Sequence, residues 1–296
     1  MEWLSSLKAA IDYMEGHLLC SVGAGEVADV VHISPFHFQR GFKIVTGYSV
    51  GEYFRNRRLY LAGLDVIKGE EKVIDLAYKY GYDTPESFTK AFSRFHGCSP
   101  MQLKTQPAKI RVFLPLKIEI VIKGGNEMDY TVEKMEAFKV IGFEKEISFE
   151  SGYQEIPQFW SEFLDKYMKH VQKSGHTEKE LQQAVKDCEI GLFGICIGDT
   201  SQENKFRYMI AGFYKEGKIP EGMTVYELPA YEWVKFKCTG PMPEALQTVN
   251  TRIFKEWIPG NPEYEIADSI NVEWYSKGDM QSVDYESAIW IPVKRK

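Results

Sequence analysis

The chain has 296 residues, of which 44% are hydrophobic and 26% charged, a composition typical of folded globular proteins. Its formal net charge of −6 excludes bulk electrostatic attraction to nucleic acid, and no apolar run approaches the ~20 residues of a membrane span, so no membrane partner is expected. The six histidines and five cysteines show no metal-ligand or CxxC spacing, and no signal peptide is evident. We therefore expect a cytoplasmic two-domain protein with reduced thiols, no metal and no cofactor.

The first hundred residues contain an internal repeat with an offset of 50 residues. The stretch ISPFHFQRGFKIVTG (33–47) reappears in altered form within YDTPESFTKAFSRFHG (82–97). The matched pairs are Ser34 and Thr84, Pro35 and Pro85, Phe38 and Phe88, Arg40 and Lys90, Phe42 and Phe92, and Gly47 and Gly97. Such a repeat indicates one supersecondary unit that is used twice.

Each copy predicts a short helix, a tight turn and a second helix. Ser34 and Thr84 suit the N-cap of the second helix, and Gly47 and Gly97 suit its C-terminal end. Phenylalanines at helical spacing predict a buried stripe, and polar residues predict an exposed stripe opposite to it. This pattern is typical of a helix-turn-helix, although two amphipathic hairpins of a helix bundle remain an alternative. Repetition of the cap, proline, glycine and basic positions favours the helix-turn-helix.

A longer helix is predicted between the copies, over VGEYFRNRRLYLAGLDVIKG (50–69). It would hold two recognition helices on one monomer, in adjacent major-groove segments about 34 Å apart. Residues 1–107 contain 12 basic and 12 acidic side chains, which leaves 24 basic and 30 acidic residues for the rest of the chain. A neutral domain has to bind double-stranded DNA through local basic groups, and RNRR (55–58) with Arg57 is one candidate.

Residues 8–106 resemble the DNA-binding domain of AraC/XylS-family transcription regulators. The resemblance is carried by VADVVHISPFHFQRGFKIVTGYSVGEYFRNRRL and VIDLAYKYGYDTPESFTKAFSRFHGCSP. It implies that the first recognition helix reaches base edges, with Gln39 suited to adenine and Arg40 to guanine. The predicted DNA-binding residues are Phe36, Gln39, Arg40, Lys43, Arg57, Thr89 and Lys90. The chain departs from its relatives at Phe36, where they have tryptophan, and at Pro85 and Glu86, where they have glutamines.

After residue 107 the hydrophobic period changes from helical to alternating. FLPLKIEIVIKGG (113–125) predicts a strand, and we place the domain boundary at residues 107/108. A second repeat, with an offset of 93, relates TVEKMEAFKVIGF (131–143) to TVYELPAYEWVKF (224–236). Each copy predicts two strands around a turn, followed by an amphipathic helix. The expected fold of residues 108–296 is α+β, a duplicated antiparallel sheet with helices, behind an all-α tandem helix-turn-helix domain of residues 1–107.

The second part resembles the GyrI-like effector-binding domain. The matching segments are YTVEKMEAFKVIGF, FGICIGDTSQENKFRYMIAGF, INVEWYSKGD and AIWIPVK. The resemblance implies a small-molecule site in which Glu273 of VEWY lies among aromatic rings. The aromatic residues expected nearest to it are Trp160, Tyr208, Tyr275 and Trp290. Many relatives carry a glutamate where this chain has Ala288, and Glu286 is one candidate to replace it.

A carboxylate among rings favours an apolar, cationic ligand, because burial of an unpaired charge is costly and aromatic faces attract cations. The alternative is that Glu273 faces solvent on an alternating strand while the rings are ordinary core. We expect a transcription regulator, an activator and not an enzyme, with a small effector and RNA polymerase as candidate partners. Two alternatives stay open. The second domain is a hydrolase, in which Glu273 with a nearby tyrosine activates water, or a drug-sequestering module; or the protein is a constitutive regulator whose second domain serves only stability or protein contact.

Overall fold

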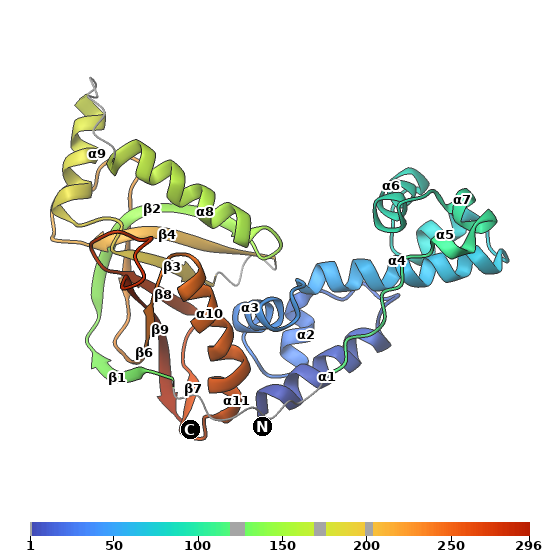
Figure 1. The fold of residues 1–296 in the computed structure, drawn as a ribbon, viewed down its shortest axis with the longest axis horizontal. Coiled ribbons are helices and arrows are strands. Elements are labelled where there is room, and N and C mark those ends of the chain that lie inside the picture. The colour runs from blue at the N-terminus through green and yellow to red at the C-terminus, as the bar shows by residue number, and fades with distance from the viewer. Residues whose placement is uncertain (1, 119–127, 169–175, 199–203) are drawn as a thin grey trace. The chain divides into compact units, whose positions relative to one another are not determined.

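The computed structural model describes residues 2–118, 128–168, 176–198 and 204–296. The chain divides into two compact units, residues 2–123 and residues 124–296 (Figure 1). The first unit is helical and the second is built on a β-sheet, which confirms the predicted fold class. No helix among the described residues is both long enough and apolar enough to cross a membrane.

The helical unit contains the two predicted helix-turn-helix motifs, α2–α3 and α5–α6. Its helices are α1 (Glu2–Gly16), α2 (Ala24–Val30), α3 (Pro35–Thr46), α4 (Val50–Lys68), α5 (Val73–Lys79), α6 (Pro85–His96) and α7 (Pro100–Thr105), followed by the 3-10 turn η1 (Pro107–Lys109). Ser34 and Thr84 each accept a hydrogen bond from the backbone N–H three residues later, at 3.4 and 3.1 Å. Gly47 and Gly97 end the second helices at φ of 81° and 74°, a left-handed conformation that glycine adopts without steric cost.

Two hydrophobic clusters, one for each motif, form the core of the helical unit. Phe38 and Phe42 are fully buried in the first cluster, and Phe88 and Phe92 are fully buried in the second. The long helix α4 passes through both, and its Leu61 packs against both. The phenylalanine stripes therefore lie where the helical period placed them.

Residues 110–118 continue from η1 as an extended segment that is not paired in a sheet. Leu116 and Ile118 pack against the first hydrophobic cluster, Ile110 packs against the second, and Phe113 packs against both. The predicted strand is therefore wrong for this part of 113–125, and its remainder lies outside the described residues. An alternating apolar pattern is equally compatible with an extended segment that lies on a helical core.

The position of the boundary between the units follows from the same contacts. Because residues 110–118 pack on the helices, they belong to the first unit, which therefore continues beyond the predicted residue 107. The change of hydrophobic period marks the end of the helices, and the end of the compact unit lies further along the chain.

The strands of the second unit form one antiparallel sheet in the described residues. They are β1 (Tyr130–Met135), β2 (Phe138–Ser148), β3 (Phe193–Ile197), β4 (Lys205–Phe213), β5 (Thr224–Leu228), β6 (Tyr231–Thr239), β7 (Tyr264–Ile266), β8 (Ile270–Tyr275) and β9 (Glu286–Arg295). Their order is β1-β6-β9-β8-β3-β4-β2-β5, and β7 pairs with β9.

The two copies of the second repeat pair with each other. β1 and β2 are joined by a two-residue bend, as predicted, and so are β5 and β6, but the strands of one copy do not pair together. Tyr130 lies opposite Phe236, and the same register continues across both bends until Gly142 lies opposite Thr224. Each half of the domain therefore completes its sheet with strands from the other half.

Helices from both halves cover one face of the sheet (Figure 1). They are α8 (Gly152–Phe163) with the π-helical turn η2 (Leu164–Met168), α9 (His176–Asp187), and α10 (Glu244–Arg252) with the π-helical turn η3 (Ile253–Trp257) and α11 (Ile258–Gly260). Phe163 of α8 contacts Phe143 of β2, with ring centroids 6.0 Å apart, and Trp257 of η3 contacts Phe236 of β6 at 5.0 Å. We call this the helix-covered face.

Candidate effector site and DNA interface

Glu273 points to the helix-covered face of the sheet and is 8% exposed. It is on β8, where Val272 belongs to the hydrophobic cluster of the opposite face, and successive residues of a strand alternate between faces. The alternative that this carboxylate faces solvent is therefore wrong.

Two tyrosines donate hydrogen bonds to the Glu273 carboxylate. The hydroxyl of Tyr208 on β4 lies 2.7 Å from Oε2, and the hydroxyl of Tyr275 on β8 lies 2.8 Å from the same oxygen. Burial raises the pKa of both phenols well above their ordinary value, and the charge of Glu273 raises it further. Both phenols therefore keep their protons at neutral pH and act as donors.

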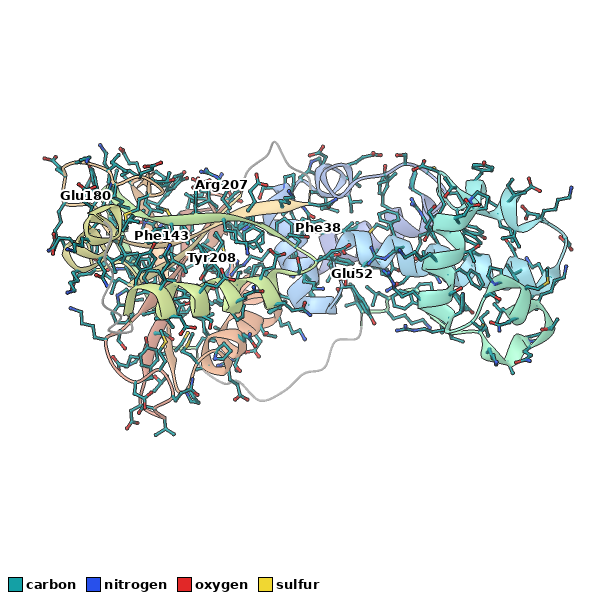
Figure 2. All side chains as sticks on the ribbon, turned by 90° about the horizontal axis from the view of Figure 1, so that it is seen from above. Phe38, Glu52, Phe143, Glu180, Arg207 and Tyr208 are labelled. Carbon is teal, nitrogen blue, oxygen red and sulfur yellow. The ribbon has the colours of Figure 1, made fainter. Side chains whose placement is uncertain are left out.

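Trp160 connects α8 to this pair of tyrosines. Its indole Nε1–H donates a hydrogen bond to the Tyr208 hydroxyl at 2.8 Å, and its ring packs edge-on against the ring of Tyr275 with centroids 5.0 Å apart. Figure 2 shows Tyr208 on the sheet beside α8. We call Trp160, Tyr208, Glu273 and Tyr275 the carboxylate cluster, and these four residues come together as the sequence predicted.

Gly194 is a residue of this site that sequence analysis did not identify. It lies on β3 directly opposite Glu273, and a Cβ atom added to it would come within 2.2 Å of the Tyr208 hydroxyl oxygen and 2.8 Å of Glu273 Oε2. The missing side chain therefore makes room for the tyrosine and the carboxylate. Only the register between β3 and β8 reveals this role, and the sequence does not give that register.

Trp290 was predicted in the site, and this prediction is wrong. It lies opposite Val272 on the other face of the sheet, where its ring packs against Phe193 at 5.6 Å and Lys235 Nζ lies 4.3 Å from the ring centroid. Glu286 does not provide a second carboxylate either, because its side chain is exposed and pairs with Lys237 at 2.6 Å. The carboxylate cluster has one acidic residue.

The carboxylate cluster is suited to holding a positive charge beside aromatic rings. Within the described residues, both hydrogen bonds to the carboxylate end on Oε2, so Oε1 is the oxygen left for a ligand. No group of three or more histidine, cysteine, aspartate or glutamate side chains in that part of the chain has the arrangement of a metal site. The interactions that the carboxylate cluster can make with a ligand are ion pairing, stacking and cation–π contact.

Two of the predicted DNA-binding residues lie on α6. Lys90 is exposed and Thr89 is half-buried on its outer side, opposite Phe88 and Phe92, and Glu86 is exposed at its start. Arg94, four residues after Lys90 and therefore on the same side of the helix, is exposed as well and was not among the predicted residues.

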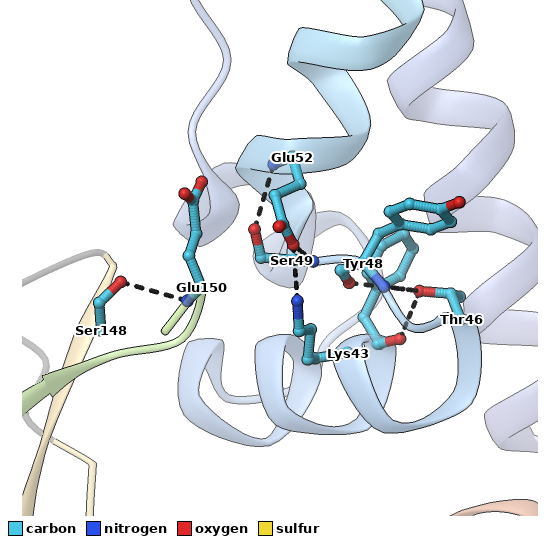
Figure 3. Close-up of polar contacts among 8 residues, drawn as sticks. Lys43, Thr46, Tyr48, Ser49, Glu52, Ser148 and Glu150 are labelled. Carbon is cyan, nitrogen blue, oxygen red and sulfur yellow. Dashed lines mark hydrogen bonds and ion pairs between the residues drawn. The ribbon is translucent and has the colours of Figure 1, made fainter. Parts of the chain in front are cut away.

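On α3, Phe36 and Gln39 are 6% and 3% exposed, and Arg40 is half-buried. Phe36 does not belong to the hydrophobic cluster that contains Phe38 and Phe42, and the contact of these three residues with DNA stays a prediction. Lys43 forms an ion pair with Glu52 at 2.7 Å, and Glu52 also caps α4 (Figure 3). An amphipathic pattern determines which stripe faces the helix's own core, and it does not determine how open the other stripe is.

Arg57 was predicted to contact phosphate, and the structure contradicts this prediction. The side chain is 5% exposed, and it donates two hydrogen bonds to the carboxylate of Glu15, from Nε at 2.8 Å and from Nη2 at 2.7 Å. Its Nη1 donates to the carbonyl oxygen of Phe113 at 2.6 Å. Arg57 therefore joins α1, α4 and the segment 110–118, and it is not available to DNA.

Two protein families match the chain, one for each unit. The family described as "Integron-associated effector binding protein" matches residues 131–293, and the family described as "Helix-turn-helix domain" matches residues 27–106. The chain is 32% identical over 96 residues to the HTH-type transcriptional activator AarP of Providencia stuartii, covering 32% of this chain and 71% of that protein.

A second relative and one solved structure extend the comparison. The chain is 30% identical over 107 residues to the Right origin-binding protein of Escherichia coli (strain K12), covering 36% of this chain and spanning 37% of the length of that relative. The structure of SAV2435 bound to tetraphenylphosphonium is similar with a TM-score of 0.45 and 20% identity, covering 56% of this chain and 94% of that one. The chain therefore belongs to the family of integron-associated effector binding proteins, with a GyrI-like effector-binding domain behind an AraC-type helix-turn-helix domain.

Proposed function

We propose that the protein is a DNA-binding transcription activator whose second unit binds a small apolar cation at the carboxylate cluster. The observation that carries the proposal is the buried Glu273 carboxylate, which is surrounded by three aromatic side chains and has no basic partner among the described residues. We propose binding rather than catalysis as the role of this cluster.

The physical reason lies in the cost of burying a charge. A buried carboxylate is stabilised by hydrogen bonds from the two phenols, but its charge is not neutralised by them. A ligand with a positive charge would neutralise it, and apolar groups on the ligand would add contact with the rings of Trp160 and Tyr275. A neutral or anionic ligand of the same size would not neutralise the Glu273 charge and should therefore bind more weakly.

Calorimetric titration of the full chain with tetraphenylphosphonium tests this site. We expect saturable binding with one ligand per chain, which Glu273→Gln weakens at least about tenfold, because the variant removes the charge and keeps the shape. Glu286→Gln is the matched control, since that carboxylate is exposed on another part of the same sheet. Equal binding by wild type and Glu273→Gln would contradict the proposal. In a separate incubation with electrophilic small molecules, chemical change in the recovered compounds would favour the hydrolase.

For the DNA-binding unit we propose that α3 and α6 of one monomer enter adjacent major-groove segments. Binding sites are first selected by the wild-type protein from a pool of random DNA duplexes. On these selected sites, Arg40→Ala should weaken binding by about 1–3 kcal/mol and relax base preference at one position. Lys90→Ala should weaken binding in the other half of the site, since Lys90 is exposed on α6. Unchanged affinity of Lys90→Ala on these sites would show that α6 does not hold DNA.

The role as an activator is tested by transcription in a purified system. With RNA polymerase and a promoter that carries the selected site, the protein should increase the amount of transcript. The effector should change this output only if it binds two conformations with different affinity. A decrease in transcript on adding the protein would make it a repressor.

A further inference from the structure

One side chain outside α4 connects the cores of the two helix-turn-helix motifs. Phe113 packs against both hydrophobic clusters of the helical unit. Its ring lies 5.2 Å from that of Tyr48, between α3 and α4, and 6.4 Å from that of Phe95 on α6. Phe113 thus contacts residues of the first motif and of the second motif at the same time.

The backbone around Phe113 is fixed to the helices on both sides. Its carbonyl oxygen accepts a hydrogen bond from Arg57 at 2.6 Å, and the N–H of Leu116 donates to the hydroxyl of Tyr53 at 3.3 Å. On the side of the second motif, the N–H of Arg111 donates to Nδ1 of His96 at 3.1 Å. The segment 110–118 is therefore held by α4 and by α6.

The helical unit needs such a connection because α4 alone is a long single link. Its 19 residues span roughly 28 Å, and long helices are rarely straight but curve gently. A bend of about 10° at one end of α4 would displace the far motif by several ångströms, which is a large error for helices that must enter successive grooves.

We propose that the segment 110–118, with Phe113 at its centre, is a positioning element that fixes the mutual orientation of the two helix-turn-helix motifs. Its consequence for two-part DNA sites rests on the proposed DNA-binding function, whereas the orientation itself does not. Phe113 is a positioning residue, since it acts through its ring contacts with Tyr48 and Phe95.

The orientation can be measured without DNA, by spin-label distances in the full chain. Cys20, the exposed cysteine, is first replaced by serine. Spin labels are then attached at Val30→Cys on α2 and Lys90→Cys on α6, and the distance between them reports the mutual orientation of the two motifs. The parent protein should give one narrow distance distribution, and Phe113→Ala should broaden or shift it. Leu114→Ala is the control, because this neighbouring side chain is 61% exposed.

Circular dichroism shows whether Phe113→Ala folds. If it does not, Phe113→Leu is used, which keeps an apolar side chain but is too short to reach both rings, and which should broaden the distribution as well. A distribution identical to the parent's in the folded variant would overturn the proposal.

A second measurement uses duplexes in which one base pair is inserted between the two halves of a selected site. The parent protein should lose about a hundredfold in affinity, and the Phe113 variant only a few-fold, with about tenfold weaker binding to the original site. An equal penalty for both proteins would overturn the role in DNA recognition. If selection with the parent protein yields no DNA site that it binds, the proposed DNA-binding function fails. The distance measurement still shows whether Phe113 fixes the mutual orientation of the two motifs.

Discussion

The carboxylate cluster depends on one residue that has no side chain. Gly194 lies opposite Glu273 in the register of β3 and β8, and the space that a Cβ would fill is occupied by the Tyr208 hydroxyl. A substitution here would push the tyrosine away from Glu273 or separate the two strands.

We expect Gly194→Ala to lower the free energy of unfolding by about 1–3 kcal/mol, because the added methyl group overpacks a buried site. It should also abolish saturable binding of tetraphenylphosphonium. Gly260→Ala is the control, since a Cβ at that position meets nothing within 4 Å. Urea denaturation and calorimetry measure the two effects, and a variant that binds like wild type would contradict the close packing.

The two tyrosines predict a dependence of stability on alkaline pH. Burial raises the pKa of Tyr208 and Tyr275 in the folded protein well above the value of about 10 in an unfolded chain. Folding therefore favours the protonated phenols, and their contribution to stability is complete below pH ~10 and is lost as the pH rises through the folded-state values.

Replacement of one phenol should reveal this contribution. Tyr275→Phe should lose less stability than wild type between neutral pH and pH ~11, as measured by urea denaturation at each pH. Tyr130→Phe is the control, because that ring is 42% exposed. The same loss of stability in wild type and Tyr275→Phe would show that Tyr275 does not ionise on unfolding.

At the scale of single residues, the sequence predicted four members of the cluster and failed on a fifth. The alternating period places Glu273 and Tyr275 on one face of their strand, and aromatic residues elsewhere could be assigned to it by resemblance. The face to which Trp290 points depends on the pairing of β8 with β9, in which Trp290 lies opposite Val272. Pairing register is a tertiary property, and a pattern within one strand does not contain it.

At the scale of elements, helix ends were predictable and the surroundings of charged side chains were not. Caps and end glycines act through local backbone bonds, and Ser34, Thr84, Gly47 and Gly97 all take the expected positions. The run RNRR on α4 has the appearance of a phosphate-binding patch, yet Arg57 is buried against Glu15 of α1. Glu15 is 42 residues away in the chain, so the partner could not be identified from local spacing.

We expect Arg57→Ala to destabilise the helical unit by about 3 kcal/mol, since it removes the positive charge beside Glu15, leaves that carboxylate with the Tyr53 hydroxyl as donor, and removes the side-chain donor to the Phe113 carbonyl. Arg55→Ala, two residues earlier and exposed on the same helix, should change stability by less than about 0.5 kcal/mol. Urea denaturation followed by circular dichroism compares the two variants. Equal stability of Arg57→Ala and wild type would show that the ion pair between Arg57 and Glu15 contributes nothing to the fold.

At the scale of the whole molecule, the sequence predicted a helical domain followed by an α+β domain. It placed the boundary too early, because residues 110–118 carry an alternating pattern but pack on helices. The uneven charge has a consequence for DNA binding. Residues 1–107 have no net charge, so overall electrostatic attraction to DNA is weak, and the DNA binding proposed above would depend on individual side chains such as Arg40 and Lys90.

The pairing of β1 with β6 and of β2 with β5 bears on how the second unit folds. A fragment that ends before β5 would leave β1 and β2 with backbone amide and carbonyl groups lacking their partners, so half the domain is not a self-sufficient folding unit. Cutting the chain in the loop between β4 and β5 should yield two pieces that are unstable apart and recombine when mixed. A chain of half this length could complete the same sheet only by pairing its leading strands with those of a second copy.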